Sequence, residues 1–338
     1  MSKSATQNNK KSDHNKYALI DKGTVVMLAW PETRVTKTGA WYDPISKVIG
    51  LIKDNTYKVG HAAFCLIDYN EEKAYYYDFG RYQAPLGYGR VRSEHTDPEL
   101  TIEIKPIIES GVVLNLNEIL IQIKQNPSCH GYGYLIGAAR DNVNIKAVYK
   151  YITSLQDMGH IRYAPFKPAS TNCSRFASSA FLKPGFDSSL SKFLNIISLF
   201  QFNLPLKQIT QKSYRDFIHV VDDNREYHKM TRSDFKAYKP KLKLEAMPNS
   251  SDSQVLIKED YHELKGLGAH AYYKIEPQGN DTYLISRYDD HNYMHFEYLY
   301  KLESGVFDIN KTFTLTYPSH AKIVSVLQDG IAVRLERL

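Results

Sequence analysis

The feature that most constrains this chain is a cysteine at the start of a short apolar helix, within residues 171–181. Apolar residues recur there at helical spacing, which indicates one buried helix face. Two prolines in residues 165–170 prevent an earlier start, and Thr171 or Asn172 is suited to cap the helix. Cys173 therefore falls in the first turn, where the partial positive charge of the helix N-terminus favours thiolate over thiol.

Burial as a small apolar residue is the alternative interpretation of Cys173, and it holds for most intracellular cysteines. The polar neighbours Asn172, Ser174 and Arg175 favour a different role, because they surround a cysteine at a helix start rather than in mid-helix. The thiolate is the nucleophilic form of cysteine. We therefore interpret Cys173 as a candidate catalytic nucleophile.

A thiolate nucleophile needs an imidazole that stabilises it and protonates the leaving group. Among the 12 histidines, His61 stands out because it begins an otherwise apolar strand directly after Gly60. A glycine there allows another backbone to come close. A buried neutral histidine would explain the same pattern. Asp78 or Tyr77, on the returning strand of a predicted hairpin, would orient the imidazole, and the strand register that decides between them is not set by sequence.

The predicted elements alternate between strands and helices. Strands are expected at residues 23–30, 59–68 and 74–79, the last two forming a hairpin through the turn at 69–72. Residues 80–92 read as a loop over a cleft or as a bent strand, and residues 100–107 as a further strand. Helices are expected from Asp43-Pro44 onward and over residues 115–126, 132–139 and 144–155, the first of these three with a capping box at Asn115.

The chain divides into four parts by composition. Residues 1–16 are rich in Ser, Asn and Lys and are expected to be disordered. Residues 17–220 hold the candidate site, and residues 221–260 are charged, polar and read as a linker. Residues 261–338 consist of short strands separated by turns, which predicts a small all-β domain.

The order of these motifs resembles one family. A strand opening with Gly60-His61, a hairpin, and later Asn172-Cys173 with Phe176 in a helix start resemble the circularly permuted papain-like cysteine enzymes. This is the permuted branch of the NlpC/P60 superfamily, with lecithin–retinol-acyltransferase-like and PPPDE-type proteins, in which the histidine strand precedes the cysteine helix. The resemblance covers residues 20–185. It implies an α+β permuted papain-like domain, followed here by the small all-β domain.

The resemblance implies Cys173 as nucleophile, His61 as base and a polar third residue, which we place at Asp78. Acyltransferase-like members usually have a second histidine in that third place, and Tyr77-Asp78 here argues against close kinship with them. Members cleave or transfer amide, isopeptide or ester acyl groups. We therefore expect a bacterial cysteine peptidase, amidase or acyltransferase whose partner is a peptide, a peptidoglycan peptide or a lipid-type acyl substrate. The rival hypothesis is a catalytically silent fold that binds partners through its tyrosine-rich tail.

Other functions find little support in the sequence. The net charge of +6 is spread along the chain, which argues against nucleic-acid binding. Three widely spaced cysteines form no CxxC pair, and we expect no metal and no cofactor. Cys129-His130 reads as a loop, and the alternating His291, His295 and Glu297 as a solvated strand face.

The sequence also bears on location and on oxyanion stabilisation. No apolar run approaches the roughly 20 residues of a membrane-spanning helix, and residues 1–16 have no apolar signal-peptide core. We therefore expect a cytoplasmic protein, or one exported by a route that leaves no N-terminal signal. Asn172 or Gln83 is a candidate oxyanion donor, together with the backbone N–H of Cys173. The motif at residues 87–90 reads as a flexible turn at the lip of a cleft.

Overall fold

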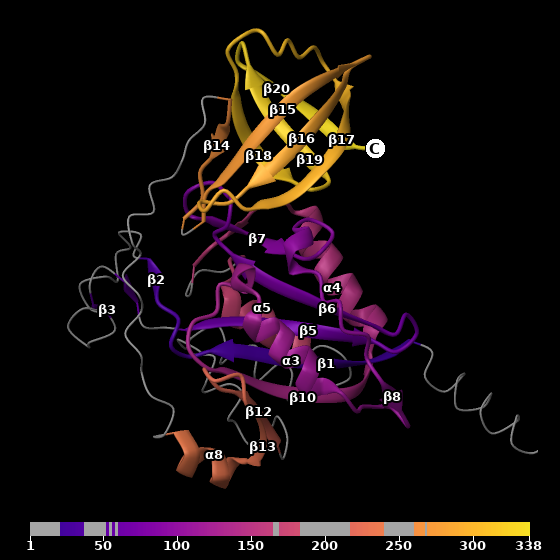
Figure 1. Ribbon diagram of the computed structural model, residues 1–338, viewed down its shortest axis with the longest axis vertical. Helices are drawn as coiled ribbons and strands as arrows, with labels where there is room; N and C mark the ends of the chain where they lie inside the picture. The colour runs from indigo at the N-terminus through magenta and orange to yellow at the C-terminus, as the bar shows by residue number, and fades with distance from the viewer. Residues whose placement is uncertain are drawn as a thin grey trace, which may run out of the picture.

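The computed structural model describes residues 21–36, 52–53, 56–57, 60–164, 169–182, 217–239, 260–267 and 269–338 (Figure 1). The predicted disordered segment 1–16 and the predicted helix from Asp43 lie outside these residues. The described chain forms an α+β domain and an all-β domain that follows it. In the described residues, no helix is long and apolar enough to cross a membrane.

An eight-stranded antiparallel sheet is the centre of the α+β domain. In spatial order its strands are β11 (Ile161–Arg162), β7 (Tyr88–Arg92), β6 (Lys73–Gly80), β5 (His61–Asp68), β1 (Lys22–Trp30), β10 (Leu135–Asn144), β12 (Phe217–Val221) and β13 (Tyr227–Thr231). The predicted hairpin is confirmed, since β5 pairs with β6 in a register that places Ala63 opposite Asp78.

Helices cover both faces of this sheet. On one face, α4 (Ile145–Asp157) and α5 (Cys173–Leu182) pack against alternate β5 residues that include Phe64. On the other face, α3 (Leu116–Gln125) packs against the intervening residues, which include Cys65. With both faces covered, every β5 residue is buried, which explains why the strand reads as one continuous apolar run.

Shorter elements complete the α+β domain. The described part of this domain includes the 3₁₀ turns η1 (Pro98–Leu100) and η2 (Pro127–Cys129). Two small sheets are formed by β2 (Val35–Thr36), β4 (Thr56–Tyr57) and β3 (Ile52–Lys53), and by β8 (Ile108–Glu109) with β9 (Val112–Val113).

Several predicted elements differ from the structure. The predicted helix over residues 132–139 is wrong, because Leu135 begins strand β10, which pairs with β1 and β12. The predicted strand over 100–107 is also wrong: η1 ends at Leu100 and no strand follows before β8. The expected capping box at Asn115 is not formed, since its side chain instead bonds to the backbone of Lys105 and Ile107. At residues 135–139, pairing with the neighbouring strands overrides local propensity.

The range predicted as a linker also contains regular structure. Strand β13 and helix α8 (Arg232–Tyr238) lie within residues 221–260, and β13 is the edge strand of the central sheet. Their polar composition suits an exposed edge, because such a strand buries little of its surface. The α+β domain therefore extends past residue 220 to α8.

The C-terminal residues form the expected all-β domain, whose single sheet is nearly closed and barrel-like. Its strands in spatial order are β14 (His262–Leu264), β15 (Ala271–Gly279), β16 (Thr282–Tyr288), β17 (Met294–Ser304), β20 (Ile331–Arg337), β19 (Ile323–Gln328) and β18 (Thr314–His320). The Tyr317 hydroxyl donates to the Lys265 carbonyl (2.6 Å) and so links the two edges. This domain lies beyond β7 of the central sheet (Figure 1).

Candidate active site

Helix α5 presents Cys173 at its N-terminus. The Asn172 side chain caps the helix, because its Oδ1 accepts the backbone N–H of Arg175 at 2.9 Å. Phe176 is buried and packs on the sheet, with its ring centroid 5.2 Å from that of Phe64. Packing against the sheet and capping thus hold the thiol at the helix start, where the helix dipole favours an anion.

The first residue of β5 brings the imidazole of His61 to this thiol. Gly60 has a φ of +74°, and a Cβ atom there would lie 3.0 Å from the Trp30 carbonyl oxygen. Glycine thus permits the close backbone approach that the sequence predicts. The imidazole stacks on Trp30 with a centroid separation of 5.6 Å and is a hydrogen-bond partner of Cys173.

Strand register decides which neighbour faces the imidazole. Asp78 lies opposite Ala63 and on the same face of the sheet as His61, with Asp78 Oδ2 3.6 Å from His61 Nε2. This separation is that of an ion pair rather than of a normal hydrogen bond. Tyr77 points to the other face and stacks on Phe64. Nε2 is therefore the ring nitrogen of His61 that faces the Asp78 carboxylate.

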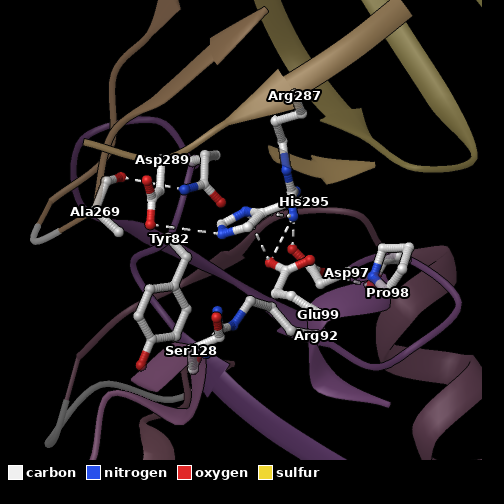
Figure 2. A network of polar contacts seen from close by, with 12 residues as sticks. Tyr82, Arg92, Asp97, Pro98, Glu99, Ser128, Ala269, Arg287, Asp289 and His295 are labelled. Atoms are coloured by element: carbon white, nitrogen blue, oxygen red, sulfur yellow. Dashed lines mark hydrogen bonds and ion pairs between the residues drawn. The ribbon is translucent and has the colours of Figure 1, made fainter. Parts of the chain in front are cut away.

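Arg92 on β7 is a further member of the site that sequence reasoning missed. Its guanidinium binds both carboxylate oxygens of Asp78, at 3.0 Å and 2.6 Å, and also donates to the Ser128 carbonyl at 2.9 Å. The guanidinium lies 3.7 Å from the ring centroid of Tyr82, and these side chains lie together in Figure 2. The signal available in the sequence was the spacing of Arg90 and Arg92, because residues two apart lie on the same face of a strand. A buried arginine on such a face requires a counter-charge.

Charge and burial act on these groups in opposite directions. Burial disfavours the imidazolium, but Asp78 and Cys173 more than offset it and raise the pKa of His61 to about 9. Burial likewise opposes ionisation of Cys173, yet hydrogen bonding and the charge of His61 lower its pKa. Arg92 outweighs burial at Asp78 and, with His61, lowers its pKa to about 2. The arrangement favours a thiolate–imidazolium pair backed by a carboxylate.

A cavity of about 270 Å³ opens beside the thiol and the imidazole. Cys173 itself is 8% exposed, so this cavity is its access to solvent. The Tyr163 hydroxyl lies 4.0 Å from Cys173 Sγ. Charged, aromatic and imidazole side chains supply much of the lining, among them Arg34, Arg81, Tyr82, His130, Tyr132 and Tyr163. An acyl group bound in the cavity would therefore be near aromatic rings as well as cationic side chains.

Other residues considered from the sequence have different surroundings. The Gln83 amide oxygen accepts from Arg90 and its nitrogen donates to the Ala269 carbonyl, and Gln83 is not among the residues that line the cavity beside Cys173. Cys129 is buried in the core on the α3 side. His295 lies beside Glu99 and Arg287 rather than on a solvated face.

Within the described residues, one group has ligand atoms close enough for a metal: Asp222, Glu226 and His228, all within 4.8 Å of one another. Its members already have protein partners. Asp222 accepts the backbone N–H of Glu226 at 2.9 Å, and His228 Nε2 lies 3.1 Å from the Tyr238 hydroxyl.

A cysteine at a helix start, packed on an antiparallel sheet beside a histidine and an aspartate, defines a cysteine-hydrolase-like fold. Residues 25–187 match the family model described as Type VI secretion system effector TseH-like. Residues 261–338 match the DUF6695 C-terminal domain. The two matches cover successive parts of the chain, and the first spans nearly the range that resembles permuted papain-like enzymes.

Among solved structures, the crystal structure of the Type VI secretion system effector TseH is similar to this chain. The two are 15% identical, with a TM-score of 0.40, and the similarity covers 62% of this chain and 98% of that chain. No curated protein matches the sequence.

Proposed function

We propose that this chain is a cysteine hydrolase or acyltransferase that acts on an amide, isopeptide or ester bond. The observation that carries this proposal is the arrangement of Cys173, His61 and Asp78, with the thiol and the imidazole lining the cavity. In this arrangement the pKa of the Cys173 thiol is lowered and the pKa of the His61 imidazole is raised. A thiolate poised beside an imidazolium suits nucleophilic attack followed by leaving-group protonation.

The proposed reaction has two steps. Cys173 Sγ attacks the carbonyl carbon, and the tetrahedral intermediate collapses as His61 passes its proton to the departing nitrogen or oxygen, which leaves a thioester. Water or another acceptor then attacks the thioester, His61 takes the acceptor's proton, and the thiolate leaves. Asp78 holds the imidazole, and backbone N–H groups at the start of α5 are suited to stabilise the oxyanion.

The substrate that we propose is an acyl compound of the peptide, peptidoglycan-peptide or lipid type. The effector family also suggests delivery to a target cell by Type VI secretion, in place of the cytoplasmic residence expected from sequence.

The rival role as a binding module requires an exposed aromatic patch on the C-terminal domain. In the described part of that domain, Tyr293 is the one aromatic among the exposed large apolar side chains. Tyr273 and Tyr300 are instead fully buried in its core. The many tyrosines of this domain therefore serve packing to a large extent, and we favour the enzyme.

The test is the rate of iodoacetamide alkylation at each cysteine between pH 5 and 9, measured by mass spectrometry. In the wild type we expect rapid labelling of Cys173 at pH 6. In His61→Ala the thiol pKa returns toward its free value of about 8.5, and labelling at pH 6 slows about 100-fold. His291→Ala, which changes an exposed histidine, is the matched control. Labelling that rises only near pH 8.5 and ignores His61 contradicts the proposal.

A further inference from the structure

The C-terminal domain contributes a residue to the lining of the candidate site's cavity. Leu267, which follows β14, lines the same cavity as Cys173 and His61. Its backbone N–H donates to the carbonyl of Arg81, another lining residue, at 3.0 Å. We propose that residues 265–267, termed here the cleft segment, are a specificity element of the active site, in which Leu267 contacts the substrate group next to the scissile bond. This inference rests on the function proposed above.

Contacts between backbones hold the cleft segment against the α+β domain. A Cβ atom on Gly266 would lie 2.6 Å from the backbone nitrogen of Gln83 and 2.3 Å from the Ala269 carbonyl oxygen. Only glycine permits that approach. The Gln83 side chain donates to the Ala269 carbonyl at 3.2 Å, and Lys265 accepts from Tyr317. Both domains thereby set the position of Leu267.

Buried charges fix the two domains to each other close to the cleft segment. Arg287 of β16 donates to Asp97 at 3.1 Å and to Glu99 at 2.5 Å, and Figure 2 shows these side chains meeting between the domains. Asp97 also binds Arg90 through two bonds of 2.7 Å each. Arg287 and Asp97 are each about 1% exposed. Buried ions of this kind tolerate little displacement, because each would lose its counter-charge.

Strand β7 connects this interface to Asp78, the carboxylate that faces His61. Arg90 and Arg92 alternate along β7 and so lie on one face of it. Arg92 holds Asp78, while Arg90 donates to Gln83 and to the Tyr82 carbonyl. The cleft segment is therefore attached to the strand that positions the catalytic carboxylate, which is the placement expected for a permanent wall of the site.

The chemistry of Leu267 sets what it selects. It is an aliphatic side chain among arginine, histidine and tyrosine lining residues of a cavity of about 270 Å³. A larger side chain at position 267 would therefore exclude a bulky substituent while a small one still reaches Sγ. A smaller side chain at position 267 would instead admit a bulky substituent more readily.

The experiment compares two alkylating reagents with the same reactive group, iodoacetamide and N-benzyl iodoacetamide, on the full chain at pH 9. The readout is the ratio of their rates at Cys173. We expect Leu267→Trp to lower the benzyl-to-unsubstituted ratio about tenfold and Leu267→Ala to raise it. Leu299→Trp, at an exposed position on β17 of the same domain, is the control and should leave the ratio unchanged.

A ratio that is the same in all three variants overturns the inference, and so does a parallel change for both reagents, since that reports altered packing instead of selection. At pH 9 an unassisted thiol also reacts. The ratio therefore remains measurable when His61 has no effect on Cys173, and failure of the cleft segment is distinguishable from failure of the proposed function.

Discussion

Strand β7 carries two buried arginines that bind two different carboxylates. Arg92 binds Asp78 in the candidate active site, and Arg90 binds Asp97 at the interface with the C-terminal domain. Each pair has two hydrogen bonds, and all four side chains are almost completely buried. Burial and bidentate geometry therefore do not distinguish the site from the interface.

The two clusters differ in the groups that their carboxylates face. Asp78 faces an imidazole whose pKa is raised to about 9 and which is paired with a thiol whose pKa is lowered. Asp97 faces a second guanidinium, that of Arg287, and these cations outweigh burial to hold its pKa well below the usual range. The interface cluster thus stays charged and fixed, whereas the site cluster can move a proton. A perturbed carboxylate alone is therefore a poor marker of catalysis.

The largest effects are expected from neutralising each carboxylate in turn. Asp78→Asn and Asp97→Asn each leave buried cationic charge uncompensated and should lower the free energy of unfolding by about 3–5 kcal/mol, measured by urea denaturation. Only Asp78→Asn should also slow alkylation of Cys173 at pH 6, because only Asp78 supports the imidazolium. Equal slowing in both variants would show that the two clusters are not functionally distinct.

The second prediction concerns the interface alone. Arg287→Met should lower the free energy of unfolding by about 3 kcal/mol, because Glu99 loses a buried partner while Asp97 keeps Arg90. Iodoacetamide should still label Cys173 at the wild-type rate. Arg334→Met removes an exposed pair with Glu303 and should cost less than about 1 kcal/mol. A similar loss of unfolding free energy in both variants would contradict the conclusion that the buried Arg287 pairs stabilise the interface.

The third prediction tests the coupling within the site. An NMR titration should find the His61 pKa near 9 in the wild type. In Cys173→Ala it should fall by about 1–3 pH units, because loss of the thiolate leaves burial less opposed. The pKa of His219, which burial lowers to about 4, serves as the reference and should not move. An unchanged His61 pKa would mean that thiol and imidazole are not electrostatically coupled.

The smallest effect is expected at a neutral neighbour of the thiol. The Tyr163 hydroxyl is 4.0 Å from Cys173 Sγ and helps to lower the thiol pKa. Tyr163→Phe should therefore slow alkylation at pH 6 about twofold, the scale of one weak hydrogen bond. A loss approaching that of His61→Ala would give the hydroxyl a central part in activation.

Local sequence determined the parts of this protein that depend on near neighbours. Prolines, the Asn172 cap and an apolar face place the start of α5, so the position of Cys173 was predictable. Gly60 and the apolar run after it likewise marked His61 and the β5–β6 hairpin. Capping, φ restriction and side-chain periodicity all act over a few residues, which is why they can be read directly.

Only the tertiary structure decided what those residues meet. The register of β5 and β6 chose Asp78 over Tyr77, and residues 135–139 became a strand because β1 and β12 pair with them. Arg92 and the contribution of Leu267 to the cavity arise from segments far apart in the chain. Such contacts depend on long-range hydrogen-bond pairing and on compensation of buried charge, and neither leaves a local pattern in the sequence.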